Sequence, residues 1–242
     1  GGRLQRVFKG RPETVNKVLE NTVAKYGGKE GFISGDRRWT FKEFSERVGK
    51  AALSLQKEYG VMKGDRVALL MGTDLDFLVS FFAVSKIGGI IVPLNTRFKG
   101  EELTFEINNS EASILIVDRE YWDAIEPFQK EWMTMKNVFV NGGITPPNTS
   151  SFELLLNNRE GKIDEVQITE DDTAMIMYTS GTTGQPKGAM QFHRGIIEAC
   201  MTIDDLYETD SDKDKALCVV PMFHSTGIIM SAISSILMGI PC

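Results

Sequence analysis

Short apolar runs alternate with amphipathic stretches along the first 140 residues. The apolar runs have the length of strands and lie at residues 67–71, 90–92, 114–117 and 138–140. The stretches between them have helical spacing and cover residues 74–87, 101–109 and 122–132. This alternation is typical of βαβ units, in which a helix returns the chain to the next parallel strand. We therefore expect an α/β fold with parallel sheets flanked by helices.

The residues before the first of these strands predict a helix, a hairpin and a second helix. Apolar residues at helical spacing predict a helix over residues 15–26, ended by two glycines. The turn at residues 34–36 predicts a small hairpin. Thr40 and Glu43 have the spacing of a capping box, so a helix should begin there and continue to about Tyr59.

A change of composition near residue 141 divides the chain. Residues 1–140 form the first expected α/β subdomain, and residues 141–172 a linker and connecting segment that begins rich in Gly, Pro, Asn and Ser. Residues 173–242 read as the start of a second α/β unit. There we expect strands at residues 173–178 and 216–220, a helix at 192–207, and an apolar helix ending near Ile240.

Composition excludes several classes of function. The net charge of −6 disfavours a broad surface for nucleic acid. Three cysteines without CxxC spacing give little support to a disulfide framework or a zinc site, so we expect no metal site and a cytoplasmic location. The apolar stretch 227–240 is too short for a transmembrane segment. Because the chain begins at Gly1 and stops directly after an apolar segment, we expect a piece of a longer protein.

The stretch after the strand at residues 173–178 has the composition of a phosphate-binding loop. Residues 179–188 combine glycines, hydroxyl side chains and one lysine, and no carboxylate lies between Thr179 and Arg194. Glycines let backbone amides approach a ligand closely, and the hydroxyls and lysine add further donors. In an open parallel sheet, ligands bind at the carboxyl ends of the strands. The loop is therefore a candidate polyphosphate site.

Two familiar nucleotide motifs do not fit this loop. A Walker loop requires G-x-x-x-x-G-K-[ST], but here Pro186 stands where the second glycine belongs and Gly188 where the hydroxyl belongs. No GxGxxG follows a predicted strand, so a dinucleotide fold has no support. The alternative is a flexible connection without a ligand, since Gly, Thr and Ser are common in loops.

The string YTSGTTGQPKG, residues 178–188, resembles the phosphate loop of the adenylate-forming superfamily, in its acyl-CoA synthetase branch. Three further stretches resemble motifs of that family in the required order: RRWTFKEFSERV at 37–48, SKIGGIIVPLN at 85–95 and VVPMFHSTG at 219–227. The first two are interpreted as packing elements. The resemblance covers nearly the whole chain.

The resemblance implies an ATP-dependent carboxylate–CoA ligase that forms an acyl adenylate and then the thioester. It implies ATP, Mg²⁺ and coenzyme A as cofactor and co-substrates, and a small carboxylic acid, most readily a fatty acid, as partner. The implied phosphate-binding residues are Thr179, Ser180, Gly181, Thr182, Thr183, Gly184 and Lys187. Aryl or other non-fatty carboxylates remain the alternative substrate class.

The same resemblance places His224 beside the substrate carboxylate. Amino-acid-activating relatives usually carry an aspartate there, so the histidine disfavours an amino-acid substrate. We expect the side chain of His224 to open onto the same crevice as the Thr179 loop, because both follow strands at their carboxyl ends. His193, at the start of a helix, is interpreted as structural.

Motifs that complete the family's nucleotide site would follow Cys242: a Thr-Glu pair near magnesium, an aspartate for ribose and a C-terminal lysine. The chain by itself is therefore expected to be inactive. A phosphate-binding module without catalysis and a purely structural α/β domain are the other readings. We further expect residues 179–188 to be poorly ordered without ligand, because the loop has few packing side chains.

Overall fold

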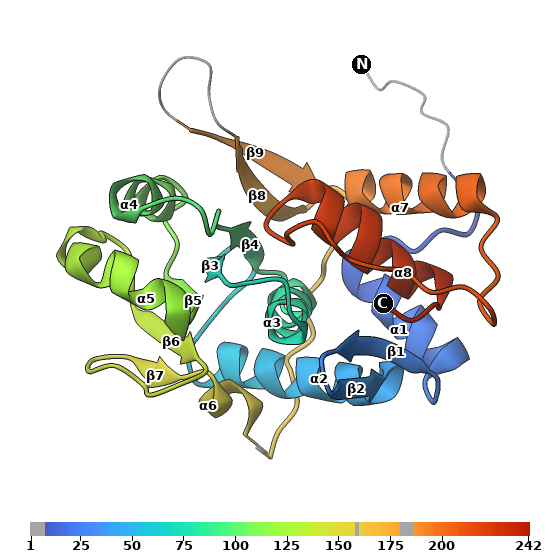
Figure 1. The fold of residues 1–242 in the computed structure, drawn as a ribbon, viewed down its shortest axis with the longest axis horizontal. Coiled ribbons are helices and arrows are strands. Elements are labelled where there is room, and N and C mark those ends of the chain that lie inside the picture. Colours follow the sequence, from blue (N-terminus) through green and yellow to red (C-terminus); the bar gives the residue numbers. More distant parts are fainter. Residues whose placement is uncertain (1–7, 158–159, 180–185) are drawn as a thin grey trace.

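The computed structural model describes residues 8–157, 160–179 and 186–242 (Figure 1). In this part of the chain the main sheet has seven strands in the order β7-β6-β5-β3-β4-β8-β9. Every neighbouring pair is parallel except β8–β9. The strands are β3 (Arg66–Leu70), β4 (Ile90–Pro93), β5 (Ile114–Asp118), β6 (Asn137–Asn141), β7 (Ser150–Ser151), β8 (Thr173–Thr179) and β9 (Lys187–Phe192). The expected α/β fold is confirmed.

Helices cover both faces of the sheet, as the alternation predicts. Along β3, Val67 and Leu69 face a core shared with α2 (Phe41–Lys57) and α3 (Leu75–Lys86). Ala68 and Leu70 face the opposite core, shared with α4 (Gly100–Asn109) and α5 (Arg119–Ile125). Strand side chains alternate between faces, so a strand covered on both sides is apolar throughout. The predicted helix at 122–132 is α5 followed by a 3-10 turn, Glu126–Glu131.

The N-terminal elements form as expected. They are α1 (Val15–Tyr26) and the antiparallel hairpin of β1 (Glu30–Ser34) and β2 (Arg37–Thr40). The capping box is present, since the Glu43 amide donates to Thr40 Oγ1 at 3.2 Å and the Thr40 amide donates to Glu43 Oε2 at 2.8 Å. These bonds satisfy amides that the first turn of α2 leaves free.

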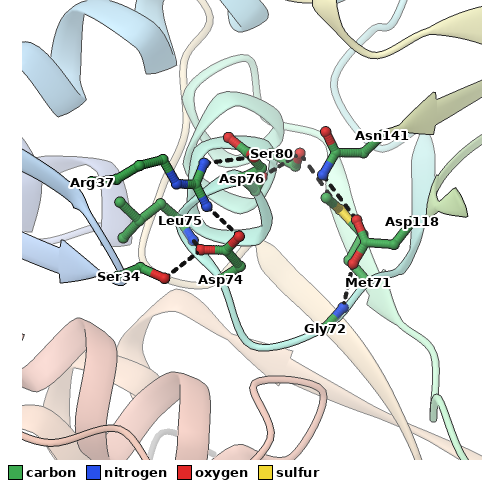
Figure 2. A network of polar contacts seen from close by, with 10 residues as sticks. All are labelled: Ser34, Arg37, Met71, Gly72, Asp74, Leu75, Asp76, Ser80, Asp118 and Asn141. Atoms are coloured by element: carbon green, nitrogen blue, oxygen red, sulfur yellow. Dashed lines mark hydrogen bonds and ion pairs between the residues drawn. The ribbon is translucent and has the colours of Figure 1, made fainter. Parts of the chain in front are cut away.

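A polar network ties the hairpin and the sheet together at the carboxyl end of β3 (Figure 2). Arg37 on β2 forms ion pairs with Asp74 and with Asp76, the latter at 2.9 Å. Asp74 also caps α3, because its Oδ1 accepts from the Leu75 amide at 2.7 Å. The RRWTFKEFSERV stretch therefore has a packing role here, as the sequence indicates.

Asp118, at the end of β5, joins three strand ends in the same network (Figure 2). Its Oδ2 accepts from the Gly72 amide at 2.7 Å and its Oδ1 from Asn141 Nδ2 at 2.9 Å. Burial raises the pKa of Asp118, and these two hydrogen bonds counteract the rise. These bonds hold the ends of β3, β5 and β6 together at the carboxyl end of the sheet, where ligands of such sheets bind.

The hairpin β8–β9 departs from the expected connection. The sequence predicts a loop from Thr179 to a helix at Phe192, whereas Lys187–Phe192 is an antiparallel strand that pairs with β8 and projects from the sheet edge (Figure 1). Five of its six residues are exposed, so it has no apolar periodicity that a sequence reading could detect. Its stability comes from backbone pairing with β8.

The strand predicted at residues 216–220 is wrong. Within the described residues, this segment pairs with no strand. Its Ala216 amide donates to the Pro241 carbonyl at 2.8 Å. Leu217 and Val219 are 80% and 75% exposed. An apolar run forms a strand only where a sheet edge can pair with it, and here none does.

The connecting segment 141–172 contains β7 and the short helix α6 (Glu153–Leu156). Ile91 on β4 pairs with Met175 on β8, so residues before and after the segment contribute to one sheet. The division at 1–140, 141–172 and 173–242 remains a prediction.

Helices follow β9 and lie beside α1 (Figure 1). They are α7 (His193–Tyr207), which confirms the helix predicted at 192–207, and a π-helical segment Thr226–Ile233 followed by α8 (Ser234–Met238). The last two together confirm the predicted apolar helix. Within the described residues, no helix has the length and apolar character needed to cross a membrane.

His193 is a buried structural residue, as expected. Its side chain is 1% exposed, and its Nδ1 accepts the Val15 amide at 3.2 Å, which joins the start of α7 to the start of α1. Burial lowers the pKa of His193 from 6.5 to about 4. The imidazole is therefore neutral at pH 7, and its Nδ1 serves as an acceptor.

This histidine should make the fold sensitive to acid. The pKa of His193 is lower in the folded protein than in the unfolded chain, so on acidification the unfolded chain takes up a proton first. The contribution of His193 to the free energy of unfolding is therefore complete above pH 6.5 and is lost as the pH falls toward 4. Between pH 7 and pH 5 the loss should be about 2 kcal/mol. His193→Asn places an acceptor near the position of Nδ1 but does not titrate. Between pH 7 and pH 5 its free energy of unfolding, measured with urea, should fall by about 2 kcal/mol less than that of the unmodified protein. Equal losses in both proteins would exclude His193 as the source.

Candidate functional site

A cavity of about 440 Å³ opens beside the carboxyl ends of β4 and β8. We call it the β8 cavity. It lies between these strands, α4, β9 and the segment before the π-helix, and its polar lining residues include Asn95, Glu106, Tyr178, Thr179, Gln191 and His224. A larger hollow of about 490 Å³, beside Tyr207 and Met230, contains none of the predicted site residues. The β8 cavity is therefore the candidate site.

Thr179 and Lys187 face each other at the loop end of the β8–β9 hairpin. They form the last pair of the β8–β9 register, and Thr179 Oγ1 lies 3.5 Å from the Lys187 carbonyl oxygen. The side chain of Lys187 is exposed, so its ammonium group is accessible to a ligand. The other predicted phosphate-binding residues, Ser180, Gly181, Thr182, Thr183 and Gly184, lie outside the described residues, as does most of the loop whose order was predicted.

His224 lines the same cavity as Thr179, although no strand precedes it. Two backbone bonds hold its position: its amide donates to the Pro221 carbonyl at 3.0 Å, and its carbonyl accepts from the Ile228 amide at 3.1 Å. His224 Nδ1 accepts from the Thr226 amide at 3.3 Å. In the neutral ring the proton is then on Nε2, which is the nitrogen that can donate to a ligand.

Glu106 is a cavity residue that the sequence reading missed. It lies on α4, its side chain is 1% exposed, and neither carboxylate oxygen has a hydrogen-bond partner within the described structure. Burial, and to a smaller degree the nearby charge of Glu102, raises its pKa to about 8. The available signal was a charged residue on the apolar face that also carries Leu103 and Ile107.

Tyr178, on β8, lines the same cavity as Glu106. Its hydroxyl donates to Asn109 Oδ1 at 2.7 Å, and its ring meets Phe105 edge to face with centroids 6.5 Å apart. Burial, followed by the charge of Glu106, raises the pKa of Tyr178 to about 12. Tyr178 is therefore a neutral phenol whose proton is directed at Asn109.

Acidic residues near the end of α7 form a turn of their own. Asp210 accepts the Lys213 ammonium at 2.8 Å and the Asp212 amide at 3.0 Å. Across the described part of the chain, no three His, Cys, Asp or Glu side chains are arranged to hold a metal ion.

Comparison with known proteins gives the family. A family model described as AMP-binding enzyme matches residues 19–242. The chain is 30% identical over 226 residues to a crotonobetaine/carnitine–CoA ligase of Escherichia coli, covering 87% of this chain and 42% of the relative. It is 31% identical over 217 residues to a long-chain-fatty-acid–CoA ligase of Mycobacterium tuberculosis, covering 84% and 40%. The chain thus spans about two fifths of the length of these relatives.

The fold is shared with solved structures. The apo structure of MbtA from Mycobacterium smegmatis superposes with a TM-score of 0.88 at 21% identity, covering 96% of this chain and 43% of that one. At this identity the likeness concerns the fold alone, while the family model covers more than nine tenths of the sequence. From the phosphate-loop signature, the α/β fold and the match of the family model, we conclude that the chain belongs to the AMP-binding enzyme family.

Proposed function

We propose that this chain is the N-terminal part of an AMP-forming carboxylic acid–CoA ligase. The observation that carries the proposal is the position of the signature YTSGTTGQPKG. Its residues Thr179 and Lys187 pair at the loop end of the β8–β9 hairpin, and Thr179 lines the same cavity as His224. The two CoA ligases to which the chain is similar support the same reaction class. The three cysteines are free thiols, which supports the expected cytoplasmic location.

The proposed reaction has two steps. A substrate carboxylate oxygen forms a bond to the α-phosphorus of ATP, and the bond from that phosphorus to the bridging oxygen breaks, so pyrophosphate leaves. The sulfur of coenzyme A, after losing its proton, then bonds to the acyl carbon, and AMP leaves. In the first step Lys187 and the amides and hydroxyls of residues 179–184 would stabilise the charge that develops on the departing pyrophosphate. In both steps His224 Nε2 would donate to an oxygen of the carboxyl group.

Magnesium enters the proposal through the family resemblance alone. It would neutralise phosphate charge, and the resemblance assigns its carboxylate ligand to a Thr-Glu pair after Cys242. The described residues offer no cluster of metal ligands at the hairpin. The residues of this chain that would contact the phosphates are Lys187 and residues 179–184.

The class of carboxylic acid is open between two groups. The resemblance favours a fatty acid, and one relative is a long-chain-fatty-acid–CoA ligase. Another relative is named for crotonobetaine and carnitine, which are small charged acids rather than fatty acids. Both groups fit a non-amino-acid substrate.

The direct test uses the longer parent protein. Incubation with ATP and a panel of carboxylic acids should release pyrophosphate only when the correct acid is present, and later addition of coenzyme A should release AMP and form the thioester. The isolated 242-residue chain should be inactive in the same assay. Pyrophosphate release that no acid stimulates would reject the ligase proposal.

His224 should affect the acid more than the nucleotide. In the parent protein, His224→Ala should raise the Michaelis constant for the acid about tenfold or more, because one hydrogen bond to a charged group is lost. The Michaelis constant for ATP should change little. His224→Gln, which can place an amide donor near the Nε2 position, should recover part of the loss. If the alanine variant binds the acid normally, His224 has no role in carboxylate recognition.

A further inference from the structure

The carboxyl group of Glu106 has no partner in a place where partners are usually required. Both oxygens are shielded from solvent, and neither has a hydrogen-bond partner within the described structure. Tyr178, which lines the same cavity, is not available as a donor, because its hydroxyl donates to Asn109 Oδ1 at 2.7 Å. A buried polar group without a partner is strongly disfavoured, so its retention beside an open cavity indicates that a ligand supplies the partner.

At neutral pH this carboxyl group is a hydrogen-bond donor. Burial raises the pKa of Glu106 to about 8, and the charge of Glu102 on the same helix adds to the rise. Most Glu106 side chains therefore carry a proton at pH 7. A protonated carboxyl group has one O–H to donate, whereas an ionised one can only accept. The missing partner at neutral pH is therefore an acceptor.

Few other titratable groups surround Glu106. The charge that acts on it is that of Glu102, on α4 itself. On β8, the pKa of the Tyr178 phenol is raised to about 12, so this group stays neutral at physiological pH. His224 lines the cavity from the segment before the π-helix. The other described residues of the lining, including those of β4 and β9, are uncharged, and the sequence of residues 180–185 contains no charged side chain.

A carboxylate is the acceptor that suits these donors best. Lys187, the cation proposed for the phosphates, does not line the cavity. A singly charged carboxylate can be held by neutral donors, whereas a polyphosphate carries several charges that cations balance better. The bond from a protonated carboxyl group to a carboxylate is short and charge-assisted. A carboxylate has two oxygens, so Glu106 and His224 can both donate to one of them and leave the other free to react.

We propose that Glu106 is a carboxylate-binding residue of the β8 cavity, which in its protonated form donates to the carboxylate of the acid and in its ionised form repels it. The proposal rests on the ligase function proposed above and adds a second donor beside His224. Two carboxyl groups that share one proton attract each other, whereas two carboxylates at the same place repel. Above about pH 8 the affinity for the acid should therefore fall about tenfold per pH unit.

A direct test uses the 242-residue protein, with butyrate as the carboxylate probe. The carbon resonance of the Glu106 carboxyl group, assigned by its absence in Glu106→Gln, is followed over a pH titration at constant ionic strength. Butyrate should raise the titration midpoint by about half a pH unit or more, because it binds the protonated form. Butyramide, its uncharged isostere, should leave the midpoint unchanged, because an amide can donate to the ionised carboxyl group as well as accept from the protonated one.

The same titration distinguishes the two anions that the ligase would bind. Inorganic pyrophosphate, the phosphate probe, should leave the midpoint of Glu106 unchanged. A shift with pyrophosphate and none with butyrate would assign Glu106 to a phosphate and overturn the proposal. A midpoint that butyrate does not move overturns it as well, and so do equal shifts with butyrate and butyramide, because they show an effect without charge recognition.

Variants of the parent ligase separate the donor from a structural role. Glu106→Met is apolar and suits a buried position, but it has no donor, so it should raise the Michaelis constant for the acid about tenfold or more at pH 7. Glu106→Gln keeps an amide donor and should stay near the normal value. From pH 7 to pH 9 the constant should rise about tenfold in the unmodified enzyme and stay level in Glu106→Gln.

Glu101→Gln, the same change at an exposed position of α4, is the control and should follow the unmodified profile. The Michaelis constant for ATP should change little in any of these proteins. A normal constant for the acid in Glu106→Met would contradict the proposal, since a purely structural carboxyl group is replaced by an apolar side chain without loss of acid binding.

This result and the ligase assay can fail separately. If the parent protein activates an acid and its Michaelis constant does not depend on Glu106, the carboxylate-binding role is wrong and the ligase function stands. If butyrate raises the midpoint of Glu106 but no acid stimulates pyrophosphate release, the ligase function is wrong and the carboxylate site stands.

Discussion

Replacing Glu106 with Gln should make the protein more stable at alkaline pH. The carboxyl group has a folded pKa of about 8, above its ordinary value of 4.5, so the folded protein retains a proton that the unfolded chain releases. The stabilising effect of the protonated form is complete below pH 4.5 and is lost as the pH rises to 8 and beyond. By pH 9 the loss should reach about 5 kcal/mol.

The glutamine side chain has nearly the shape of the protonated acid and does not titrate. In Glu106→Gln, residue 106 should therefore add nothing to the change in the free energy of unfolding between pH 5 and pH 9. In the unmodified protein, the free energy of unfolding should fall over the same range. Urea unfolding followed by circular dichroism at several pH values measures the difference. Glu101→Gln, exposed on the same helix, is the control for the loss of one surface charge. Parallel pH profiles for Glu106→Gln and the unmodified protein would show that the carboxyl group is solvated rather than buried.

The sheet could be predicted because its order depends on local patterns. β3, β4, β5 and β6 are buried on both faces, so each is a short run of apolar residues that stands out from the helices beside it. The helix starts at Thr40 and Asp74 use side chains adjacent in sequence to the amides they cap. Such features do not depend on distant parts of the chain.

The two segments that were predicted wrongly depend on contacts with distant parts of the chain. β9 forms because β8 offers it a backbone edge, and its exposed side chains carry no periodic signal. Residues 216–220 have the apolar composition of a strand but find no edge to pair with in this structure. In both segments pairing with another strand decides the outcome, and pairing cannot be read from one stretch of sequence.

The candidate site was predicted in part. Thr179, Lys187 and His224 could be singled out because they lie in contiguous motifs that resemble a known family, and their roles stay predictions. Glu106 carries no motif, and its importance follows from burial and from the absence of a partner, both of which are tertiary properties. A charged residue among the buried positions of α4 was a visible sign, but sequence alone does not show that no lysine or arginine reaches it.

Lys187→Ala should slow the first half-reaction of the parent ligase much more than the second. Lys187 is exposed at the loop end of the β8–β9 hairpin, where its ammonium group would contact the phosphates that depart as pyrophosphate. Loss of one hydrogen bond to a charged group is worth about 1.5–3 kcal/mol, which corresponds to a slowing of roughly 10- to 150-fold. Transfer from a preformed acyl adenylate to coenzyme A involves no pyrophosphate and should keep nearly its normal rate.

Two controls separate charge from structure. Lys187→Arg keeps a cation at the hairpin and should retain more of the pyrophosphate release than the alanine variant does, although a guanidinium group contacts phosphate with a different geometry. The β8–β9 pairing should survive both changes, because β9 is held by backbone bonds and its first side chain is exposed. Rates are measured as pyrophosphate release with ATP and acid, and as thioester formation from synthetic acyl adenylate. Equal slowing of both half-reactions would mean that Lys187 supports the active conformation as a whole, and its assignment to the departing pyrophosphate would be wrong.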